Sequence, residues 1–221
     1  MSKTPAYLPS RESDPYLQGR VPFPSINLRS PKTGLLLVDM QNGCLHPEHE
    51  YYSARLRDTT LPALRALLSA FRRVGFPVFH THIQSLTHNG DDRSTIHKTL
   101  ECHYPPGSDK AEFLKEVAPL VGEPIFPKTA SSVFNSTNID RVLRNIGIEN
   151  LVIGGVVTTG CVETAVRDAA DLGYRVVMPE DACAAIVEDM HWATVRAVRD
   201  VYAEVSSSED VVKRLGEAAS R

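Results

Sequence analysis

Short apolar runs alternate along the chain with segments of helical periodicity, and this alternation constrains the fold more than any other feature. The apolar runs predict strands at residues 35–38, 77–83, 123–128, 150–157 and 204–208, and at the start of residues 174–182. Strands that alternate with helices favour right-handed crossovers and a mainly parallel sheet. We therefore predict an α/β fold, a Rossmann-like three-layer α/β/α sandwich with about six strands.

The segments between the runs carry helix signals. Apolar residues recur at helical spacing, and several segments end at a glycine, which favours the left-handed turn that closes a helix. Helices are predicted at residues 61–75, 136–147, 161–173 and 190–203, with a shorter one at 110–117. Residues 84–109 form a polar insert, and residues 1–33, rich in Pro, Ser and Arg, form an extended arm. One domain is expected over residues 34–221.

Charge and composition exclude several kinds of partner. The 221 residues carry a net charge of -3, so there is no basic footprint for nucleic acid. No apolar run has the length that crosses a bilayer, and the polar N-terminus lacks the apolar core of a secretory signal. Four cysteines are dispersed through the chain: Cys44, Cys102, Cys161 and Cys183. This usage favours a reducing, cytoplasmic location.

Three reactive side chains follow predicted strands. Asp39 ends the first apolar run, Lys128 ends the third and Cys161 follows the fourth. In open parallel sheets, ligands bind beside the carboxyl ends of the strands. Asp39 could act as a general base there, and Lys128 could hold two anions. Taken singly, Asp39 could equally be a helix cap and Lys128 a solvated surface residue.

Cys161 stands between a strand and a helix. A helix N-terminus offers free N–H groups and a positive dipole end, both of which lower a thiol pKa. Gly160 would allow a tight backbone turn just before it. A free cysteine is also often a buried and inert residue. From its position alone, Cys161 is as well explained by packing as by nucleophilic catalysis.

Several motifs together resemble the isochorismatase-like cysteine hydrolase superfamily. They are "LLLVDMQNGCL", the stretch from "KTASSVF" through "GGVVTTGCVETAV", and "HWATVRAVRDVYAEV". The likeness covers about residues 33–212. It implies an isochorismatase-like hydrolase domain with a triad of Asp39, Lys128 and Cys161, which hydrolyses small amides through a thioester.

The resemblance also implies a cis peptide bond between Val156 and Val157. The backbone N–H groups of Val157 and Cys161 would then bind the oxyanion. For substrate contacts we expect a set of five residues: Gln41, His82, Phe134, Val157 and Thr158. Gln41 could instead hold the loop after Asp39, and Phe134 could be ordinary core.

The histidines raise the question of a metal. His80 and His82 share one face of a predicted strand, and His46 and His49 lie in a loop. The nicotinamidase branch of the superfamily carries an Asp-x-His metal motif, but Ile83 and Ser85 stand at the matching positions. We predict no metal and no cofactor.

Other residues of the polar regions have open roles. Arg93, His97 and His103 in the insert could recognise an anionic substrate group, although solvated charge is the usual role of such residues. Cys44 and Cys102 could border the pocket or be bystanders. Cys183 is expected to be buried packing, and His191 to serve the structure or an interface.

The leading hypothesis is a cysteine amidohydrolase that cleaves a C–N bond of a small amide, carbamoyl or ureido compound. The alternatives are an isochorismatase-type or other non-amide hydrolase on the same site, and a non-catalytic α/β scaffold. A redox enzyme is not indicated, because the sequence has neither a C-x-x-C nor a dinucleotide fingerprint. We expect a small-molecule substrate and a homo-oligomer, either a dimer or a tetramer.

Overall fold

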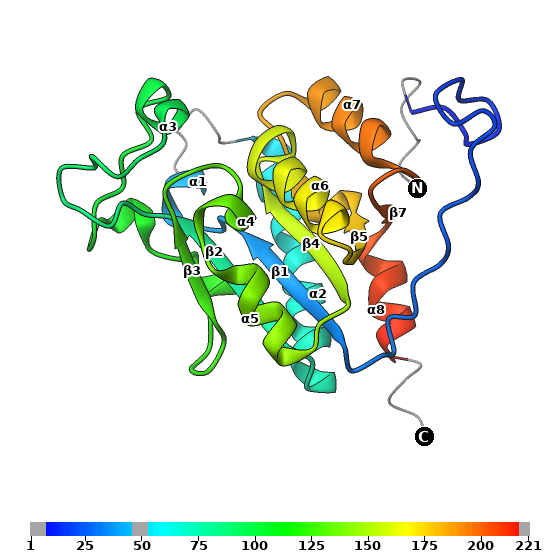
Figure 1. Ribbon diagram of the computed structural model, residues 1–221, viewed down its shortest axis with the longest axis horizontal. Helices are drawn as coiled ribbons and strands as arrows, with labels where there is room; N and C mark the ends of the chain where they lie inside the picture. The colour runs from blue at the N-terminus through cyan, green and yellow to red at the C-terminus, as the bar shows by residue number, and fades with distance from the viewer. Residues whose placement is uncertain (1–7, 46–52, 217–221) are drawn as a thin grey trace.

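The computed structural model describes residues 8–45 and 53–216, built around a parallel sheet (Figure 1). The strand order is β3-β2-β1-β4-β5-β7, with β6 paired to β4. The six predicted strands are confirmed as β1 (Thr33–Val38), β2 (Val78–Ile83), β3 (Ile125–Lys128), β4 (Asn150–Val156), β5 (Arg175–Pro179) and β7 (Glu204–Ser206). The seventh, β6 (Cys183–Ala184), has two residues, too few to show a pattern in the sequence.

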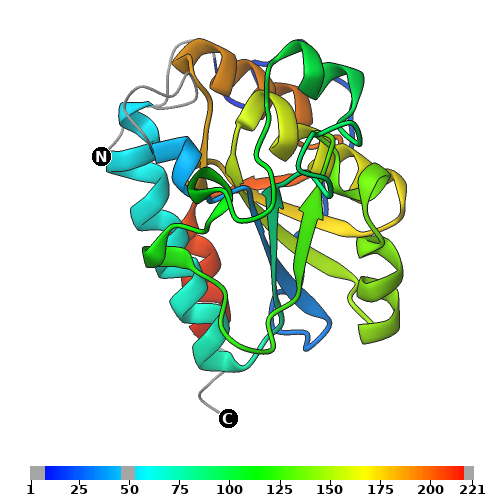
Figure 2. The same ribbon diagram turned by 90° about the vertical axis from the view of Figure 1, so that its left-hand side faces the viewer.

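Helices cover both faces of the sheet, which confirms the three-layer prediction (Figures 1 and 2). One layer holds α2 (Leu61–Val74) and α8 (Ser208–Gly216), and the other holds α5 (Ile139–Ile146), α6 (Glu163–Asp171) and α7 (Glu188–Val198). Strand β1 serves both layers. Leu35 and Leu37 pack into the core under α2 and α8, whereas Leu36 and Val38 pack into the core under α5 to α7. A strand buried on both faces therefore appears in the sequence as a continuous apolar run.

Two of the long helices end at the glycine that their sequences predict, whereas α7 ends at Val198 and not at residue 203 as predicted. Gly75 follows α2 with φ 72°, and Gly147 follows α5 with φ 86°. Both are left-handed, a conformation that glycine adopts without a steric penalty. The N-terminus of α5 is held by the residue before its N-cap. Asn138 is the N-cap residue and makes no side-chain cap, while the Ile139 N–H donates to Thr137 Oγ1 at 3.2 Å.

Several short elements differ from the sequence prediction. Residues 110–117 form two separate 3₁₀ turns, Asp109–Ala111 and Lys115–Val117, instead of one helix. Four further helices were not predicted: α8 and the short helices α1 (Asn42–Leu45), α3 (Thr95–Thr99) and α4 (Val133–Ser136). Helices of four or five residues are too short to display helical periodicity. For α8 the signal was present, because Val211 and Leu215 are spaced by four and both are buried.

The part of the arm that the structure describes, residues 8–32, contains no helix or strand and packs on the domain. Asp14 is fully buried and pairs with Arg196 at 2.8 Å and with Arg199 at 2.9 Å. Ile26 and Leu28 enter the same core as α2 and α8. In the described parts of the chain, no helix is long and apolar enough to cross a membrane.

Candidate active site

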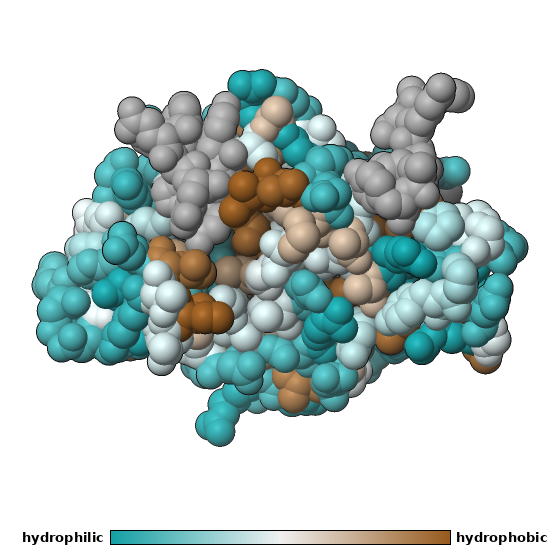
Figure 3. All heavy atoms as spheres, turned by 90° about the horizontal axis from the view of Figure 1, so that it is seen from above, coloured by the Kyte–Doolittle hydropathy of each residue, from teal (hydrophilic) through white to brown (hydrophobic). Residues whose placement is uncertain are grey.

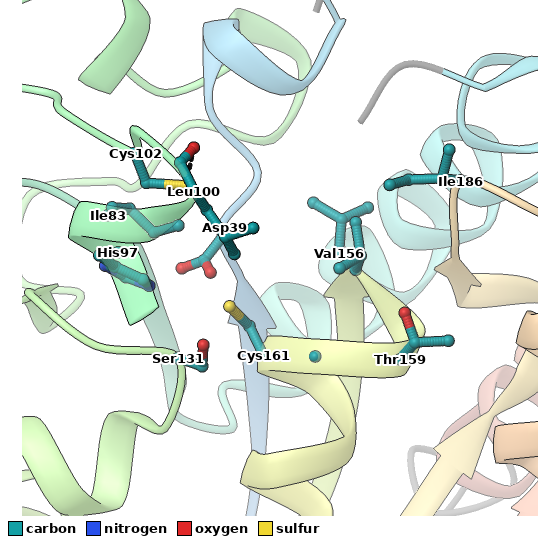
Figure 4. A pocket seen from close by; sticks show the side chains of 12 residues that line it. Asp39, Ile83, His97, Leu100, Cys102, Ser131, Val156, Thr159, Cys161 and Ile186 are labelled. Atoms are coloured by element: carbon teal, nitrogen blue, oxygen red, sulfur yellow. Dashed lines mark hydrogen bonds between the residues drawn. The ribbon is translucent and has the colours of Figure 1, made fainter. Parts of the chain in front are cut away.

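Three strands bring the predicted reactive residues together at the carboxyl edge of the sheet. Figure 4 shows two of them, Asp39 and Cys161, facing each other across the cavity floor. Asp39 follows β1, Lys128 ends β3, and Cys161 lies in the turn after β4. Lys128 Nζ is 2.8 Å from Asp39 Oδ2 and donates to Cys161 Sγ at 3.1 Å. All three residues are buried. These three side chains therefore lie together, as their positions after separate strands predicted.

The fold holds Asp39 in one orientation. Its φ of 54° lies in the left-handed region, which few residues other than glycine adopt and which is common at functional sites. Thr81 of β2 holds both the backbone and the side chain of Asp39. The Asp39 N–H donates to Thr81 O and Oγ1 at 3.1 Å each, and Thr81 Oγ1 donates to Asp39 Oδ1 at 2.6 Å. This role of Thr81 was not predicted from the sequence.

Lys128 is held as a cation. Burial alone would lower its pKa, but the neighbouring Asp39 carboxylate and Cys161 sulfur together raise the pKa of Lys128. Its Nζ also donates to Ala130 O at 3.1 Å. The ammonium group therefore has three acceptors for its three protons: Asp39 Oδ2, Cys161 Sγ and Ala130 O.

The charge state of Cys161 differs from the sequence prediction. Burial raises the pKa of Cys161 to about 12, and the nearby Asp39 carboxylate acts in the same direction, against the lowering effect of Lys128. The helix N-terminus does not make this a free thiolate, contrary to the expectation from its position. A single ammonium group in a dry site balances one anion and not two. The raised pKa therefore indicates that the Cys161 thiol carries a proton near neutral pH.

The backbone before Cys161 is irregular. The Val156–Val157 peptide bond is cis, as the family resemblance implied. A π-helical turn, Thr158–Val162, then leads into α6. Gly155 has φ 132°, and a Cβ there would lie 2.1 Å from Val38 O, so β4 passes β1 at a distance only glycine allows. Gly160 was expected to serve a tight turn, but it has no positive φ and a Cβ there would meet only Val157 Cγ2.

A cavity of about 280 Å³ opens above the triad. Known small-molecule pockets span ~300–1,000 Å³, so this cavity suits a small substrate. Figure 3 shows the face that carries the carboxyl edge of the sheet, and Figure 4 shows the cavity from close by. The lining residues are Asp39, Ile83, His97, Leu100, Cys102, Ser131, Val156, Val157, Thr159, Gly160, Cys161 and Ile186.

Of the five residues expected to contact substrate, only Val157 lines this cavity. The Gln41 amide is used by the backbone: Oε1 accepts from the Ile83 N–H at 2.7 Å, and Nε2 donates to Lys110 O at 2.9 Å. His82 Nδ1 bonds to Ala111 O at 2.8 Å, and its ring stacks on Phe113. These residues shape the cavity wall from behind.

Phe134 and Thr158 also lie away from the cavity. Phe134 packs against the core under α5 to α7, 6.1 Å from the ring of Tyr174. Thr158 is buried, and its Oγ1 hydrogen-bonds to His191 Nδ1 at 2.9 Å. His191 is itself fully buried in α7, so it ties the turn that carries Cys161 to that helix.

The polar insert supplies His97, which was expected as one of three residues that recognise an anion. Burial, and secondarily Lys128, lower the pKa of His97 to about 4, so it is uncharged near neutral pH. Arg93 and His103 do not line the cavity. Arg93 Nε donates to Gly90 O at 3.0 Å, and His103 Nε2 bonds to His88 O at 3.2 Å.

No cluster of three or more His, Cys, Asp or Glu side chains suitable for a metal occurs in the described residues. His80 instead bonds through Nε2 to Glu123 Oε2 at 2.8 Å, and burial lowers the pKa of its imidazole. His46 and His49, which raised the metal question, lie outside the described residues.

Several of the lining residues were not predicted from the sequence. Ser131 and Thr159 stand close to Lys128 and Cys161 in the sequence, so their proximity to the triad was a usable signal. Leu100 and Ile186 come from loops far from any predicted strand end, and no sequence pattern marked them.

Comparisons with known proteins agree with this architecture. The family model "Isochorismatase domain" matches residues 33–210. The ureidoacrylate amidohydrolase of Agrobacterium fabrum is 30% identical over 216 residues, with 88% of this chain and 94% of that protein covered. The structure of N-carbamoylsarcosine amidase from Thermoplasma acidophilum is 31% identical, with a TM-score of 0.69 and coverage of 80% and 96%.

A cysteine hydrolase structure from Pseudomonas syringae has a TM-score of 0.79 at 24% identity, covering 91% of this chain and 99% of that chain, and supports the fold. The family model spans most of the chain. The protein therefore belongs to the isochorismatase family, and it is a hydrolase with an isochorismatase-like fold.

Proposed function

We propose that the protein is a cysteine amidohydrolase that cleaves a C–N bond of a small amide, carbamoyl or ureido compound. The observation that carries this proposal is the position of Lys128 Nζ, 2.8 Å from Asp39 Oδ2 and 3.1 Å from Cys161 Sγ, beneath a cavity that Asp39 and Cys161 line. A base, a cation and a nucleophile in mutual contact are what acyl transfer to a thiol requires.

In the proposed first half-reaction, Asp39 takes the proton of the Cys161 thiol as Sγ attacks the carbonyl carbon of the substrate. Lys128 stays positive and stabilises whichever of the two groups carries the negative charge. The N–H groups of Val157 and Cys161 bind the oxyanion that forms on the carbonyl oxygen. The C–N bond then breaks, the leaving nitrogen takes the proton from Asp39, and ammonia or an amine departs.

The second half-reaction releases the acid. Asp39 removes a proton from a water molecule, which attacks the thioester carbonyl of the acyl-enzyme. The C–S bond breaks, and the sulfur recovers its proton from Asp39. The site returns to its starting state with its proton on Cys161. Every proton passes through Asp39, so the base must stay beside the sulfur, as the Thr81 contacts ensure.

Two of the relatives support this reaction type, because one is a ureidoacrylate amidohydrolase and the other an N-carbamoylsarcosine amidase. An isochorismatase-type reaction remains the second candidate, because it belongs to the same family. The two are distinguished by Cys161, since only the amidohydrolase reaction needs a sulfur nucleophile. The expected homo-oligomer remains a prediction.

The test is ammonia release from the purified protein over a panel of small amides and ureido compounds, with Cys161→Ala in parallel. The proposal expects release from at least one compound and none from the alanine variant. Equal release by both proteins would eliminate the thioester route, whereas no release from any compound by either protein would favour the second candidate.

A further inference from the structure

Among the described histidines, His97 is the one that borders the cavity. It lies in α3 of the insert, lines the cavity and is only 2% exposed. Its Nδ1 is buried and has no hydrogen-bond partner in the part of the chain that the structure describes. His82 and His191 each hold a bond through Nδ1; His191 Nε2 also lacks a hydrogen-bond partner among the described residues, but neither of these residues lines the cavity. A buried polar atom without a partner costs free energy that a ligand can recover.

The imidazole points into the cavity. Figure 4 shows an edge of the His97 ring directed toward the space between Asp39 and Cys161, opposite the turn that carries Thr159. Its position is fixed from behind, because Ser94 Oγ accepts from the His97 N–H at 3.2 Å and caps the short helix. A polar group held at the wall of the site can orient the substrate for attack by Cys161.

Apart from Ser131 and Thr159, the rest of the wall is apolar. Beyond the reaction centre it is formed largely by Ile83, Leu100, Val157 and Ile186. Leu100 and Ile186 are about half exposed, and apolar side chains (brown) also appear around the hollow on this face in Figure 3. Among the described residues that line the cavity there is no lysine or arginine. Residues 46–52, which the structure does not describe, contain none in the sequence.

We propose that His97 is a specificity-determining residue whose uncharged imidazole hydrogen-bonds the substrate, and that the site selects an uncharged amide with a compact apolar substituent over one that carries a carboxylate. This inference rests on the proposed function. A carboxylate brought into this wall loses its hydration and gains no cation in exchange. An apolar substituent gains contact with Leu100 and Ile186. His97 forms a hydrogen bond with one polar atom of the amide or of the group next to it.

A matched set of substrates tests the selectivity. Butyramide, succinamate and methyl succinamate share the amide and the two-carbon spacer and differ at the far end. We expect kcat/KM, measured by ammonia release at pH 7.5, to be at least about tenfold higher for the two uncharged compounds than for succinamate. A preference for succinamate that depends on Cys161 would overturn this inference and leave the proposed function intact.

A second measurement does not require turnover. Butyraldehyde and succinic semialdehyde each add reversibly to a thiol, with the S–H proton passing to the carbonyl oxygen to give a thiohemiacetal. The two aldehydes carry the same far ends as butyramide and succinamate. The extent to which each aldehyde protects Cys161 against alkylation therefore reports how tightly that end is bound. Tighter binding of butyraldehyde supports the inference, and equal or tighter binding of the semialdehyde overturns it. If neither aldehyde binds and no amide is hydrolysed, both the inference and the proposed function are wrong.

Variants of His97 test the residue itself. His97→Leu removes the hydrogen bond with little change in volume, and we expect kcat/KM for butyramide to fall about tenfold. His97→Asn keeps an uncharged polar group and should restore part of the loss, which a purely structural role would not predict. The control is His88→Leu, an exposed histidine of the same insert that does not line the cavity. An unchanged kcat/KM in His97→Leu would overturn the assignment.

Discussion

The floor and the far wall of the cavity are built in different ways. At the floor, three parallel strands bring Asp39, Lys128 and Cys161 together, and Thr81 and Ala130 satisfy their remaining polar atoms. Much of the far wall comes from the insert, where the one helix is the five-residue α3. There, His97 Nδ1 has no partner among the described residues, and Leu100 is about half exposed.

This difference separates reaction type from specificity. A sheet edge positions side chains through backbone pairing, so a triad at that edge stays in place whatever the neighbouring loops contain. The loop wall has no such constraint, and its chemistry can change without disturbing the floor. The isochorismatase fold therefore identifies a hydrolase, and we expect the insert to influence which compound it hydrolyses. Substitutions in the two regions are expected to have different effects.

The largest effect is expected at the floor. Cys161→Ala removes the nucleophile and should lower kcat by about 10⁴-fold or more, because the members of a triad act as a unit. Cys183→Ala is the matched control, since Cys183 is a buried cysteine that does not line the cavity. Ammonia release by both variants checks this, with melting temperature to confirm folding. Comparable losses in the two variants would show that packing, and not the nucleophile, accounts for the effect.

Charge variants of the triad should move the titration of Cys161 in opposite directions. The Asp39 carboxylate raises the pKa of the thiol and Lys128 lowers it. Asp39→Asn should therefore lower the Cys161 pKa and speed alkylation near pH 7, while it abolishes hydrolysis. Lys128→Met should raise the Cys161 pKa and slow alkylation below the wild-type rate. The measurement is the alkylation rate of each protein between pH 6 and 10, and a slower rate in Asp39→Asn would contradict this account of the Cys161 pKa.

A smaller effect is expected behind the floor. His191 is buried, hydrogen-bonds Thr158 and meets the ring of Trp192 edge to face at 4.9 Å. His191→Phe keeps the ring and loses the bond to the turn that carries Cys161. We expect kcat to fall roughly tenfold with KM little changed, because small displacements of a nucleophile are costly. A rise in KM at constant kcat would instead place His191 in substrate binding.

The smallest effect on activity is expected far from the cavity. Hydrogen bonds from Arg72 and the backbone of Leu120, and the contact with His80, outweigh burial and lower the pKa of Glu123 to about 2. A carboxyl group with a lowered pKa stabilises the fold above its unfolded value of 4.5, and this stability is lost as the pH falls toward 2.

Glu123→Gln should therefore unfold more easily than the wild type at pH 7 and show a weaker loss of stability between pH 4.5 and 2. Urea unfolding at several pH values measures this, and kcat at pH 7.5 should stay within about twofold. A pH dependence identical to that of the wild type would show that other carboxylates control acid stability.

The floor could be predicted from the sequence better than the wall, for a physical reason. Strands buried on both faces leave continuous apolar runs, and the residue after each run lies at the sheet edge, so the sequence alone groups Asp39, Lys128 and Cys161. The wall depends on how a loop without periodicity folds back. His97 and Leu100 lie in the insert and Ile186 lies far along the chain, and no local pattern predicts that they line one cavity.

The errors have the same origin. Gln41 and His82 stand next to strand ends, which suggested contact with substrate, but their side chains satisfy the backbone of neighbouring loops. A residue type and a strand end do not reveal which polar groups nearby lack partners. The pKa of Cys161 was misjudged similarly, because the helix N-terminus is visible in the sequence and the burial that raises the pKa is not.

The proposed mechanism requires Cys161 to form a thioester with the acyl group of the substrate. Acid quenching during turnover, followed by peptide mass spectrometry, tests it directly. We predict that the peptide containing Cys161 gains the mass of the acyl group, that neutral hydroxylamine removes this mass, and that Cys161→Ala gains none. Hydrolysis at the wild-type rate by Cys161→Ala, or an acyl group attached to a different residue, would contradict the account.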